Sequence, residues 1–225
     1  MKSLASSTTT RAMLGSSVTT TSSSCSRVRA RASTSMTMRI GPPKFFNTRS
    51  DRAMKKARLL TTIEPLKRGL ECDEETSEQV DNLCQALEKV NPTAEPLASD
   101  LVNGQWRLVY TTSESILGKK KKKFLQPSGP IYQTIDAESL KARNQETGPL
   151  YNRVDAVLIP EENSVSKVKV QFKTFRILGL IPIKAPASAR GELDITYLDE
   201  DMRICRGDKG NLFVLLMEDP SVRLR

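Results

Sequence analysis

The sequence predicts a mainly β fold, in which about eight short antiparallel strands form an up-and-down barrel or a sandwich and two N-terminal helices pack against it. Two observations lead to this prediction. Apolar residues recur every three or four positions over residues 51–91, as on one face of a helix, and alternate with polar residues after residue 104, as in a half-exposed strand. Turn-forming residues separate the alternating segments at short intervals.

The first helix is expected to begin at Asp51, which can cap its N-terminus, and to end at Gly69. Pro65 is expected to kink or restart it, because proline lacks the N–H group that a helix interior needs. One face carries Leu59, Ile63 and Leu66, and the opposite face, expected to point to water, carries Lys55, Lys56 and Arg58.

The second helix is expected to start at Thr76 and Gln79, which have the spacing of a capping box, and to stop before Asn91-Pro92. Each helix has one apolar stripe, which needs a partner surface. Packing against the sheet is the favoured use, and docking of the basic face of the first helix on a membrane is the alternative. The stripe of the second helix consists of Val80, Leu83, Cys84, Leu87 and Val90.

The strands are expected from Gly104 onward. Alternation is clearest in residues 167–173 and 192–197, where one face is apolar and the other is charged or polar. A closed barrel of about eight strands can hold one small ligand or be filled by its own side chains. The pattern leaves both outcomes open. The strand candidates are 104–111, 131–137, 139–145, 150–159, 167–173, 192–197, 202–206 and 211–217.

The first fifty residues differ in composition from the rest of the chain. They contain eight Lys or Arg and no Asp or Glu. Of the 35 basic residues in the chain, 27 therefore follow residue 50, against 26 acidic ones, so residues 51–225 carry a formal charge of only +1. A Ser-rich, Arg-containing, acid-free segment is typical of a plastid or mitochondrial transit peptide, with cleavage expected roughly between residues 30 and 50. A disordered tail without a targeting function is the alternative.

The remaining residues, 51–225, have the size of one domain, helical over 51–91 and β from 104 to 225. No run of 18 apolar residues, the length of a membrane-spanning helix, occurs in the sequence. Three cysteines of this part, Cys72, Cys84 and Cys205, lack the spacing of a disulfide framework or metal site. They indicate buried thiols in a reducing compartment, and a redox-switched Cys72–Cys84 bridge is the minor alternative.

The chain contains no histidine, which excludes Ser-His-Asp and Cys-His catalysis and the usual mixed zinc sites. It also lacks a Walker loop and a Gly-x-Gly-x-x-Gly turn. The adjacent acids Asp199, Glu200 and Asp201 are expected to form an exposed turn rather than a catalytic site. We expect Asp194 to point outward and to pair with Arg203 across neighbouring strands. The sequence therefore indicates no enzyme, no cofactor and no metal.

Four blocks of sequence stand in a recognisable order. They are Thr62–Gly69 (TIEPLKRG), Gly104-Gln105-Trp106 with Tyr110-Thr111-Thr112, Leu178–Pro186 (LGLIPIKAP), and Arg190–Val214 (RGELDITYLDEDMRICRGDKGNLFV). The chain resembles the plastid lipid-associated protein family, also called fibrillins, in all four. The resemblance covers roughly residues 55 to 223, with Cys205 at a position where serine is more usual in the family.

The resemblance implies a lipocalin-like barrel in a plastid, associated with thylakoids or plastoglobules, where family members bind or organise lipids, carotenoids and prenylquinones. It implies no catalytic residue. A structural protein with a filled barrel, acting through protein contacts, is the main alternative. An enzyme would instead require an inward-facing acidic pair among Asp136, Asp155 and Asp194. The candidate ligand or lipid contacts are Trp106, Tyr110, Ile177, Leu178, Leu180 and Ile181.

Trp106 follows Gly104 by two residues at the head of the first strand, an arrangement with which lipocalin-like barrels commonly begin. We expect it to plug the closed end of the barrel first and to contact a ligand second.

A run of five lysines lies between the first two strand candidates and is followed by Phe124. Near an anionic lipid surface each lysine can contribute about 1 kcal/mol, so the run can attract the protein to a membrane. A solvated loop that protects a strand edge is the alternative. Nucleic acid is not the expected partner, because no aromatic residues are interleaved for base stacking. The run consists of Lys119, Lys120, Lys121, Lys122 and Lys123.

The segment 177–183 is the second candidate for lipid contact. Gly179, Pro182 and the nearby Pro186 make it a poor central strand, so we expect an apolar loop at one end of the barrel. Its five large aliphatic side chains need shielding from water, each worth about 1.5–3 kcal/mol when buried. The favoured cover is the barrel mouth and the helices of the protein itself. A lip that dips into a membrane or gates the cavity is the alternative.

Overall fold

A computed structural model describes residues 48–224 of the 225-residue chain. The expected transit peptide and its cleavage region lie outside the described residues, apart from residues 48–50. The described helical elements are α1 (Thr48–Ile63), η1 (Glu64–Gly69), α2 (Glu74–Glu88), η2 (Pro96–Ala98), η3 (Asp100–Val102), α3 (Glu114–Leu117) and η4 (Lys123–Leu125). Among these, no helix combines the length and the apolar character needed to cross a membrane.

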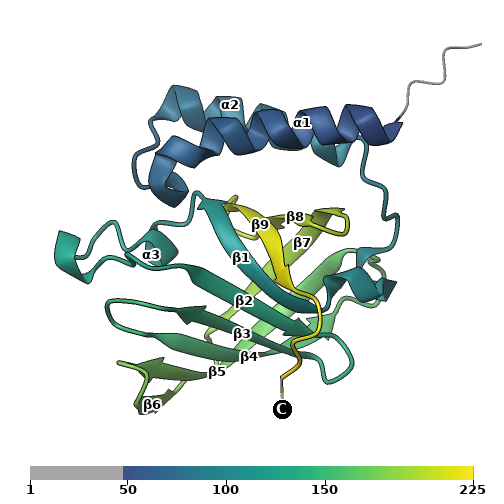
Figure 1. Ribbon diagram of the computed structural model, residues 1–225. Coiled ribbons are helices and arrows are strands. Elements are labelled where there is room, and N and C mark those ends of the chain that lie inside the picture. Colours follow the sequence, from purple (N-terminus) through teal and green to yellow (C-terminus); the bar gives the residue numbers. More distant parts are fainter. Residues whose placement is uncertain (1–47, 225) are drawn as a thin grey trace, which may run out of the picture. The chain divides into compact units, whose positions relative to one another are not determined.

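Eight of the nine described strands close into an antiparallel barrel, which confirms the predicted fold class. Within the ring each of β1–β4 pairs with the next strand, β5 pairs with β7, β7 with β8, β8 with β9, and β9 pairs with β1 to close it. β6 pairs only with β5 and stands outside the ring (Figure 1). The strands are β1 (Gly104–Thr111), β2 (Ile131–Asp136), β3 (Lys141–Glu146), β4 (Arg153–Pro160), β5 (Lys167–Ile177), β6 (Ile181–Lys184), β7 (Arg190–Leu198), β8 (Met202–Gly207) and β9 (Leu212–Asp219).

The helices α1 and α2 cover one side of the barrel, above β1 and β7–β9 (Figure 1). Their buried side chains and those on the outer face of these strands form one cluster, which we call the helix-facing core. The favoured use of the two apolar stripes, packing against the sheet, is therefore confirmed. The cluster comprises Leu59, Ile63, Leu66, Val80, Cys84, Leu87, Tyr110, Tyr197, Met202, Ile204, Leu212 and Val214.

A second cluster, the inner core, lies inside the barrel. Trp106, Ile195 and Leu215 are among its buried members. Because side chains alternate across a strand, β1 and β7–β9 contribute to both clusters. On β8, four consecutive residues from Met202 to Cys205 are consequently buried.

The chain between α1 and α2 has the predicted break. Pro65 stands at the start of η1, and Gly69 ends it with a φ of +105°, a conformation that favours glycine. A Cβ atom at Gly69 would lie 2.3 Å from the carbonyl oxygen of Thr111. Only glycine therefore lets this bend approach the end of β1.

The start of α2 differs from the prediction. The helix begins at Glu74, and Asp73 caps it by accepting a hydrogen bond of 2.8 Å from the backbone N–H of Thr76. Thr76 was expected to be the capping residue, but Asp73 offers a carboxylate one turn earlier. A charged acceptor at the positive end of the helix is the stronger cap.

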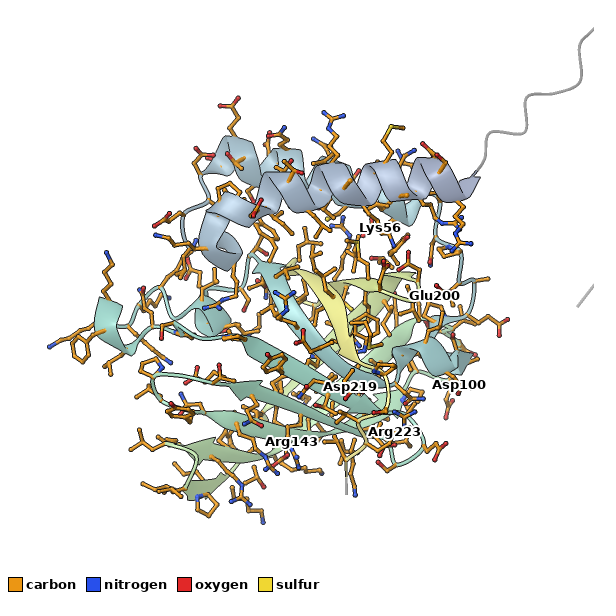
Figure 2. The ribbon with its side chains drawn as sticks, in the orientation of Figure 1. Lys56, Asp100, Arg143, Glu200, Asp219 and Arg223 are labelled. Carbon is orange, nitrogen blue, oxygen red and sulfur yellow. The ribbon has the colours of Figure 1, made fainter. Side chains whose placement is uncertain are left out.

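Lys56 was expected to point to water, but it does not. Its ammonium group donates a hydrogen bond of 2.8 Å to Asp199 and also binds Asp201, both in the β7–β8 turn. Figure 2 shows Lys56 on the side of α1 that faces the barrel. The expected exposed acidic turn is therefore half-buried at Asp199 and holds the first helix in place. Lys55 instead binds Asp51 within the helix.

The expected pairing of Asp194 with Arg203 is also wrong. Two residues of β7 oppose one residue of β8 between Ile195 and Tyr197, and this bulge shifts the register. Arg203 consequently lies opposite Leu198, inside the barrel, while Asp194 lies opposite Arg206. Arg206 binds Asp81 and Glu88 of α2 on the outer face, each at 2.8 Å.

Replacing Lys56 with methionine should leave Asp199 half-buried without its cation. We expect the free energy of unfolding to fall by about 1–3 kcal/mol, the usual cost of an unpaired buried polar group. Urea unfolding followed by circular dichroism measures this loss. Lys55→Met is the matched control, because its ion pair is local to the helix and worth about 0.5 kcal/mol. Equal losses in the two variants would contradict the role of Lys56.

The β7–β8 turn also makes the free energy of unfolding depend on pH in the acid range. Burial by itself raises the pKa of Asp199, but hydrogen bonds shared with Asp201, Lys56 and Tyr197 outweigh it and lower the pKa to about 2. A depressed carboxyl pKa stabilises the fold fully above the unfolded value of about 3.9 and loses this effect as the pH falls toward 2. We expect the stability difference between the wild type and Asp199→Asn to be largest above pH 4. Thermal unfolding across this range measures it, and a pH-independent difference would be the contrary result.

Candidate functional site

The barrel encloses a cavity of about 930 Å³. All eight barrel strands contribute to its walls, together with β6 and the loop after β1. The exposed residues Lys121, Ile183 and Lys209 are part of its lining, so the cavity opens to solvent at this end of the barrel. We call this end the mouth.

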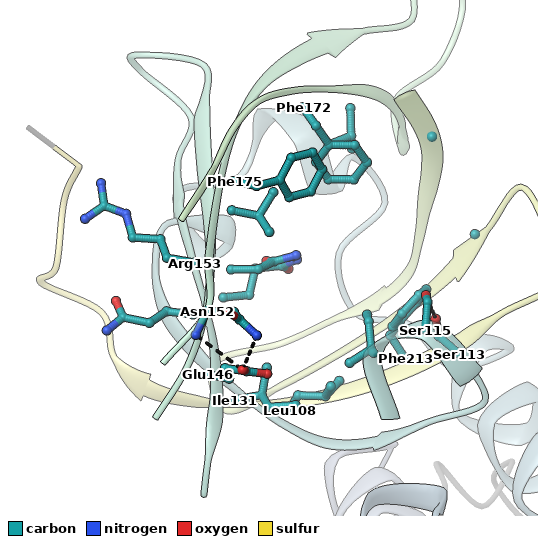
Figure 3. Close-up of a pocket in the computed structure, with 18 of the residues that line it drawn as sticks. Leu108, Ser113, Ser115, Ile131, Glu146, Asn152, Arg153, Phe172, Phe175 and Phe213 are labelled. Carbon is teal, nitrogen blue, oxygen red and sulfur yellow. Dashed lines mark hydrogen bonds between the residues drawn. The ribbon is translucent and has the colours of Figure 1, made fainter. Parts of the chain in front are cut away.

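The walls of the cavity are mostly apolar (Figure 3). The rings of Phe172 and Phe175 lie together on β5, with centroids 6.1 Å apart and planes tilted by 33°. Leu108, Ile131 and Phe213 approach from β1, β2 and β9. A volume of this size with apolar walls falls within the range of small-molecule sites, about 300–1,000 Å³.

Polar and charged residues also contribute to the lining. Near the mouth, the carboxylate of Glu146 accepts hydrogen bonds from the side chain and the backbone N–H of Asn152 (Figure 3). Deeper in the barrel, Gln133 and Asn144 face each other across β2 and β3 and are joined by a hydrogen bond of 3.0 Å. Such isolated polar groups can orient a ligand that is otherwise apolar.

Trp106 plugs the far end of the barrel. Its side chain is fully buried, and its indole N–H donates a hydrogen bond of 3.0 Å to the carbonyl oxygen of Val102. The guanidinium carbon of Arg203 lies 4.7 Å from the centre of the indole ring. Arg203 is itself fully buried, which lowers the pKa of its guanidinium group, and it donates a hydrogen bond to the Gln133 side chain. This stacked pair closes the barrel.

A smaller cavity of about 90 Å³ lies toward the closed end. Its other lining residues include Ile135 of the inner core, and it shares six residues with the main cavity: Gln133, Asn144, Val154, Val170, Phe172 and Leu193. The amide pair therefore stands where the two cavities meet.

The β5–β6 hairpin projects from the mouth. The segment 177–183 was expected to be a loop covered by the barrel itself, and both expectations are wrong. It is a hairpin in which Pro182 is tolerated because β6 is an edge strand. Leu180 is 80% exposed, the highest value among the large apolar residues described. The other exposed aliphatic residues of the hairpin are Ile177, Leu178, Ile181 and Ile183.

The lysine run, Lys119–Lys123, lies in the loop between β1 and β2, as predicted, and is exposed throughout. Phe124 follows it and is 71% exposed. Lys121 lines the cavity together with Ile177 and Ile183, so the lysine run and the hairpin border the same mouth. Arg68 of η1 anchors this loop by donating hydrogen bonds to the carbonyl oxygens of Pro127 and Gly129.

The predicted contact residues are thus only partly brought together. Ile177 lines the cavity, and Leu178, Leu180 and Ile181 form the exposed hairpin beside it. Trp106 lies at the opposite end of the barrel. Tyr110 lies on the outer face in the helix-facing core, with its hydroxyl 3.5 Å from both Cys72 and Ser77.

Sequence reasoning missed Gln133, Asn144 and Arg203. A signal for the first two was present, because Gln133 stands between Ile131 and Ile135 at an inward position of its strand. A polar residue at such a position is a candidate ligand contact. Arg203 could not be found in this way, since β8 is buried on both faces and the polarity of its residues therefore does not identify the inward face.

The acidic residues that an enzyme would need do not meet inside the barrel. Asp136 is buried at the closed end, where it accepts hydrogen bonds from the backbone N–H groups of Ser139 and Leu224. Asp155 binds Arg143 and Arg153, and Asp194 points away from the interior. Within residues 48–224, no cluster of three or more His, Cys, Asp or Glu side chains could hold a metal ion.

Comparisons with known proteins give a consistent family. The PAP_fibrillin family model matches residues 53–216. The chain is 48% identical to "Probable plastid-lipid-associated protein 5, chloroplastic" of Arabidopsis thaliana, in an alignment that covers 75% of this chain and 71% of that protein. It is 30% identical to "Chromoplast-specific carotenoid-associated protein, chromoplastic" of Cucumis sativus, in an alignment that covers 75% of this chain and 68% of that protein. It is 28% identical to "Light-induced protein, chloroplastic" of Solanum tuberosum, in an alignment that covers 79% of this chain and 70% of that protein. No solved structure matches significantly.

The three described cysteines should differ sharply in reactivity. All three are free thiols; Cys72 is half-buried, while burial raises the pKa of Cys205 to about 11 and that of Cys84 to about 12. Because the thiolate is the reactive form, we expect one fast-reacting thiol at pH 8 in a Cys25→Ser variant, and three after unfolding in urea. Titration with Ellman's reagent counts them. Loss of the fast thiol in Cys72→Ser identifies it, and three fast thiols in the folded protein would contradict the described burial.

Proposed function

We propose that this chain, which belongs to the PAP_fibrillin family, binds a hydrophobic small molecule inside its barrel and contacts a lipid surface with the mouth of that barrel. The family and its relatives place the protein in the plastid with a lipid-associated role. The proposal adds the ligand and the thylakoid or plastoglobule surface.

The single observation that carries the proposal is the hollow barrel. A structural protein with a filled barrel would leave no space for a ligand, whereas this barrel keeps about 930 Å³ behind apolar walls. A lipid, a carotenoid or a prenylquinone is the class of ligand that such walls favour, because apolar surface leaves water on binding. None of Asp136, Asp155 and Asp194, the acids expected to form the pair of an enzyme, lines the described cavity, which favours a carrier over a catalyst.

The mouth supports contact with lipid. The exposed aliphatic residues of the β5–β6 hairpin have no cover within the described chain, and each contributes about 1.5–3 kcal/mol when removed from water. The lysine run borders the same opening and can add about 1 kcal/mol per lysine near anionic lipid. A protein seated on a membrane in this orientation would face its cavity toward the lipid, where apolar ligands are dissolved.

Lipid extraction of the natively purified mature protein, followed by mass spectrometry, tests the ligand directly. We expect an apolar lipid, pigment or quinone in a stoichiometric amount. Absence of any bound molecule, together with no association with liposomes, would favour the structural alternative in which the protein acts through protein contacts.

The double variant Leu180→Asp, Ile181→Asp tests the surface contact. Both side chains are exposed, at 80% and 55%, so the variant should fold with a melting temperature close to that of the wild type. We expect its flotation with vesicles of galactolipid and a minor fraction of phosphatidylglycerol to fall at least about tenfold, because two charges must then leave water.

Val165→Asp is the matched control for this variant. Val165 is 51% exposed, but it lies in the loop between β4 and β5 at the closed end of the barrel. Flotation should remain unchanged in this control. If the hairpin variant floats like the wild type, the hairpin does not contact lipid.

A further inference from the structure

We propose that the deep wall of the cavity recognises a carbonyl oxygen of the ligand through the side-chain amide of Asn144, which Gln133 and Arg203 orient. This inference rests on the proposed function, since it names the chemical class of the molecule that the cavity takes. It follows from the order in which three side chains donate and accept hydrogen bonds.

Arg203 starts the chain of hydrogen bonds. A guanidinium group only donates, so the atom of Gln133 that faces it is the oxygen, Oε1. Arg203 cannot turn away, because its side chain is fully buried against the face of Trp106. The orientation of the Gln133 amide is therefore fixed by a charged partner.

Gln133 passes this orientation on to Asn144. With its oxygen directed at Arg203, Gln133 presents its amino group, Nε2, to Asn144, and the distance from Nε2 to Oδ1 of Asn144 is 3.0 Å. The two residues are direct partners in the β2–β3 ladder, so neither can slide past the other. The oxygen of Asn144 is thereby directed at Gln133, and its amino group, Nδ2, points away from Gln133.

The amino group of Asn144 stands at the cavity wall. Asn144 lines both the main cavity and the smaller cavity at its closed end. Among the described residues, no hydrogen-bond acceptor for Nδ2 is found. The other residues that line both cavities include Val154, Val170, Phe172 and Leu193, which offer no acceptor in their side chains. The deep wall therefore presents the oriented amino group of Asn144, next to that of Gln133, in apolar surroundings.

A donor in this setting selects the ligand. A hydrocarbon would bury Nδ2 without a partner, which costs free energy, whereas a ligand oxygen that accepts its hydrogen bond removes this cost. The fitting molecule is an apolar chain or ring system with a ketone, quinone or ester carbonyl at the end that enters first. Unsubstituted hydrocarbons are disfavoured.

Displacement of diphenylhexatriene, a fluorescent hydrocarbon, from the full chain tests this preference. Dodecane, methyl decyl ketone and the corresponding secondary alcohol serve as competitors of matched length. In the wild type we expect the ketone to bind about three- to tenfold more tightly than dodecane, the range for one hydrogen bond. Asn144→Leu should remove this ratio and still bind diphenylhexatriene. Lys141→Leu, at an exposed position of β3 that lines neither cavity, should keep the ratio.

The variant Gln133→Glu tests the orienting role of Gln133. The carboxylate still pairs with the buried Arg203, so the fold is maintained, but it has no amino group to offer Asn144. Asn144 then turns Nδ2 toward the carboxylate and presents Oδ1 to the cavity. We expect the ketone to lose its higher affinity relative to dodecane. The alcohol, which can donate a hydrogen bond to Oδ1, should still bind more tightly than dodecane. A structural role for Gln133 alone would change all three competitors equally.

The outcomes separate the two proposals. If the wild type does not bind diphenylhexatriene, the cavity does not admit apolar molecules and the proposed function fails. If it binds diphenylhexatriene but shows equal affinity for dodecane and the ketone, or if Asn144→Leu retains the ketone preference, the proposed function stands and the recognition by Asn144 is wrong.

Discussion

The stacking of Arg203 on Trp106 is the interaction on which the architecture of the barrel depends. Burying a cation is costly, and here the indole face and the oxygen of Gln133 compensate it in part, while Nε and Nη1 of Arg203 have no hydrogen-bond partner among the described residues. The contact joins β1, β2 and β8 at one end of the barrel. That end retains only the small cavity of about 90 Å³, whereas the main cavity of about 930 Å³ opens at the mouth at the other end. The two ends of the barrel therefore differ, since the main cavity opens at the mouth.

The same strands serve two different cores. On their outer face, β1 and β7–β9 are covered by α1 and α2, which are held by the ion pairs of Lys56 with the β7–β8 turn and of Arg206 with α2. On their inner face they support Trp106 and line part of the cavity. Side chains from β3–β5 contribute to the cavity without a helix outside them. The helices can therefore stabilise the protein without occupying the space that a ligand needs.

Leu180 and Tyr110 show where sequence patterns fail to predict the surroundings of a side chain. Composition singled out the apolar segment 177–183 correctly, but an apolar segment is more often buried, so the favoured cover was the protein itself. The structure leaves Leu180 exposed because β5 continues past the end of β7 and pairs with β6 beyond the barrel. Tyr110 shows the opposite case, since a β-bulge between Leu108 and Tyr110 turns it to the helices rather than to the interior.

Local patterns in the sequence by themselves determined the two helices, the strand segments, the turns and, through four ordered blocks, the family. These features depend on periodicity, on proline and glycine geometry and on short motifs, all of which act within a few residues. Only the tertiary structure decided that the barrel is hollow, that Arg203 points inward, and that Gln133 and Asn144 meet in the wall. These depend on the register between strands and on the volume that side chains leave unfilled, which are set by contacts between residues far apart in the chain.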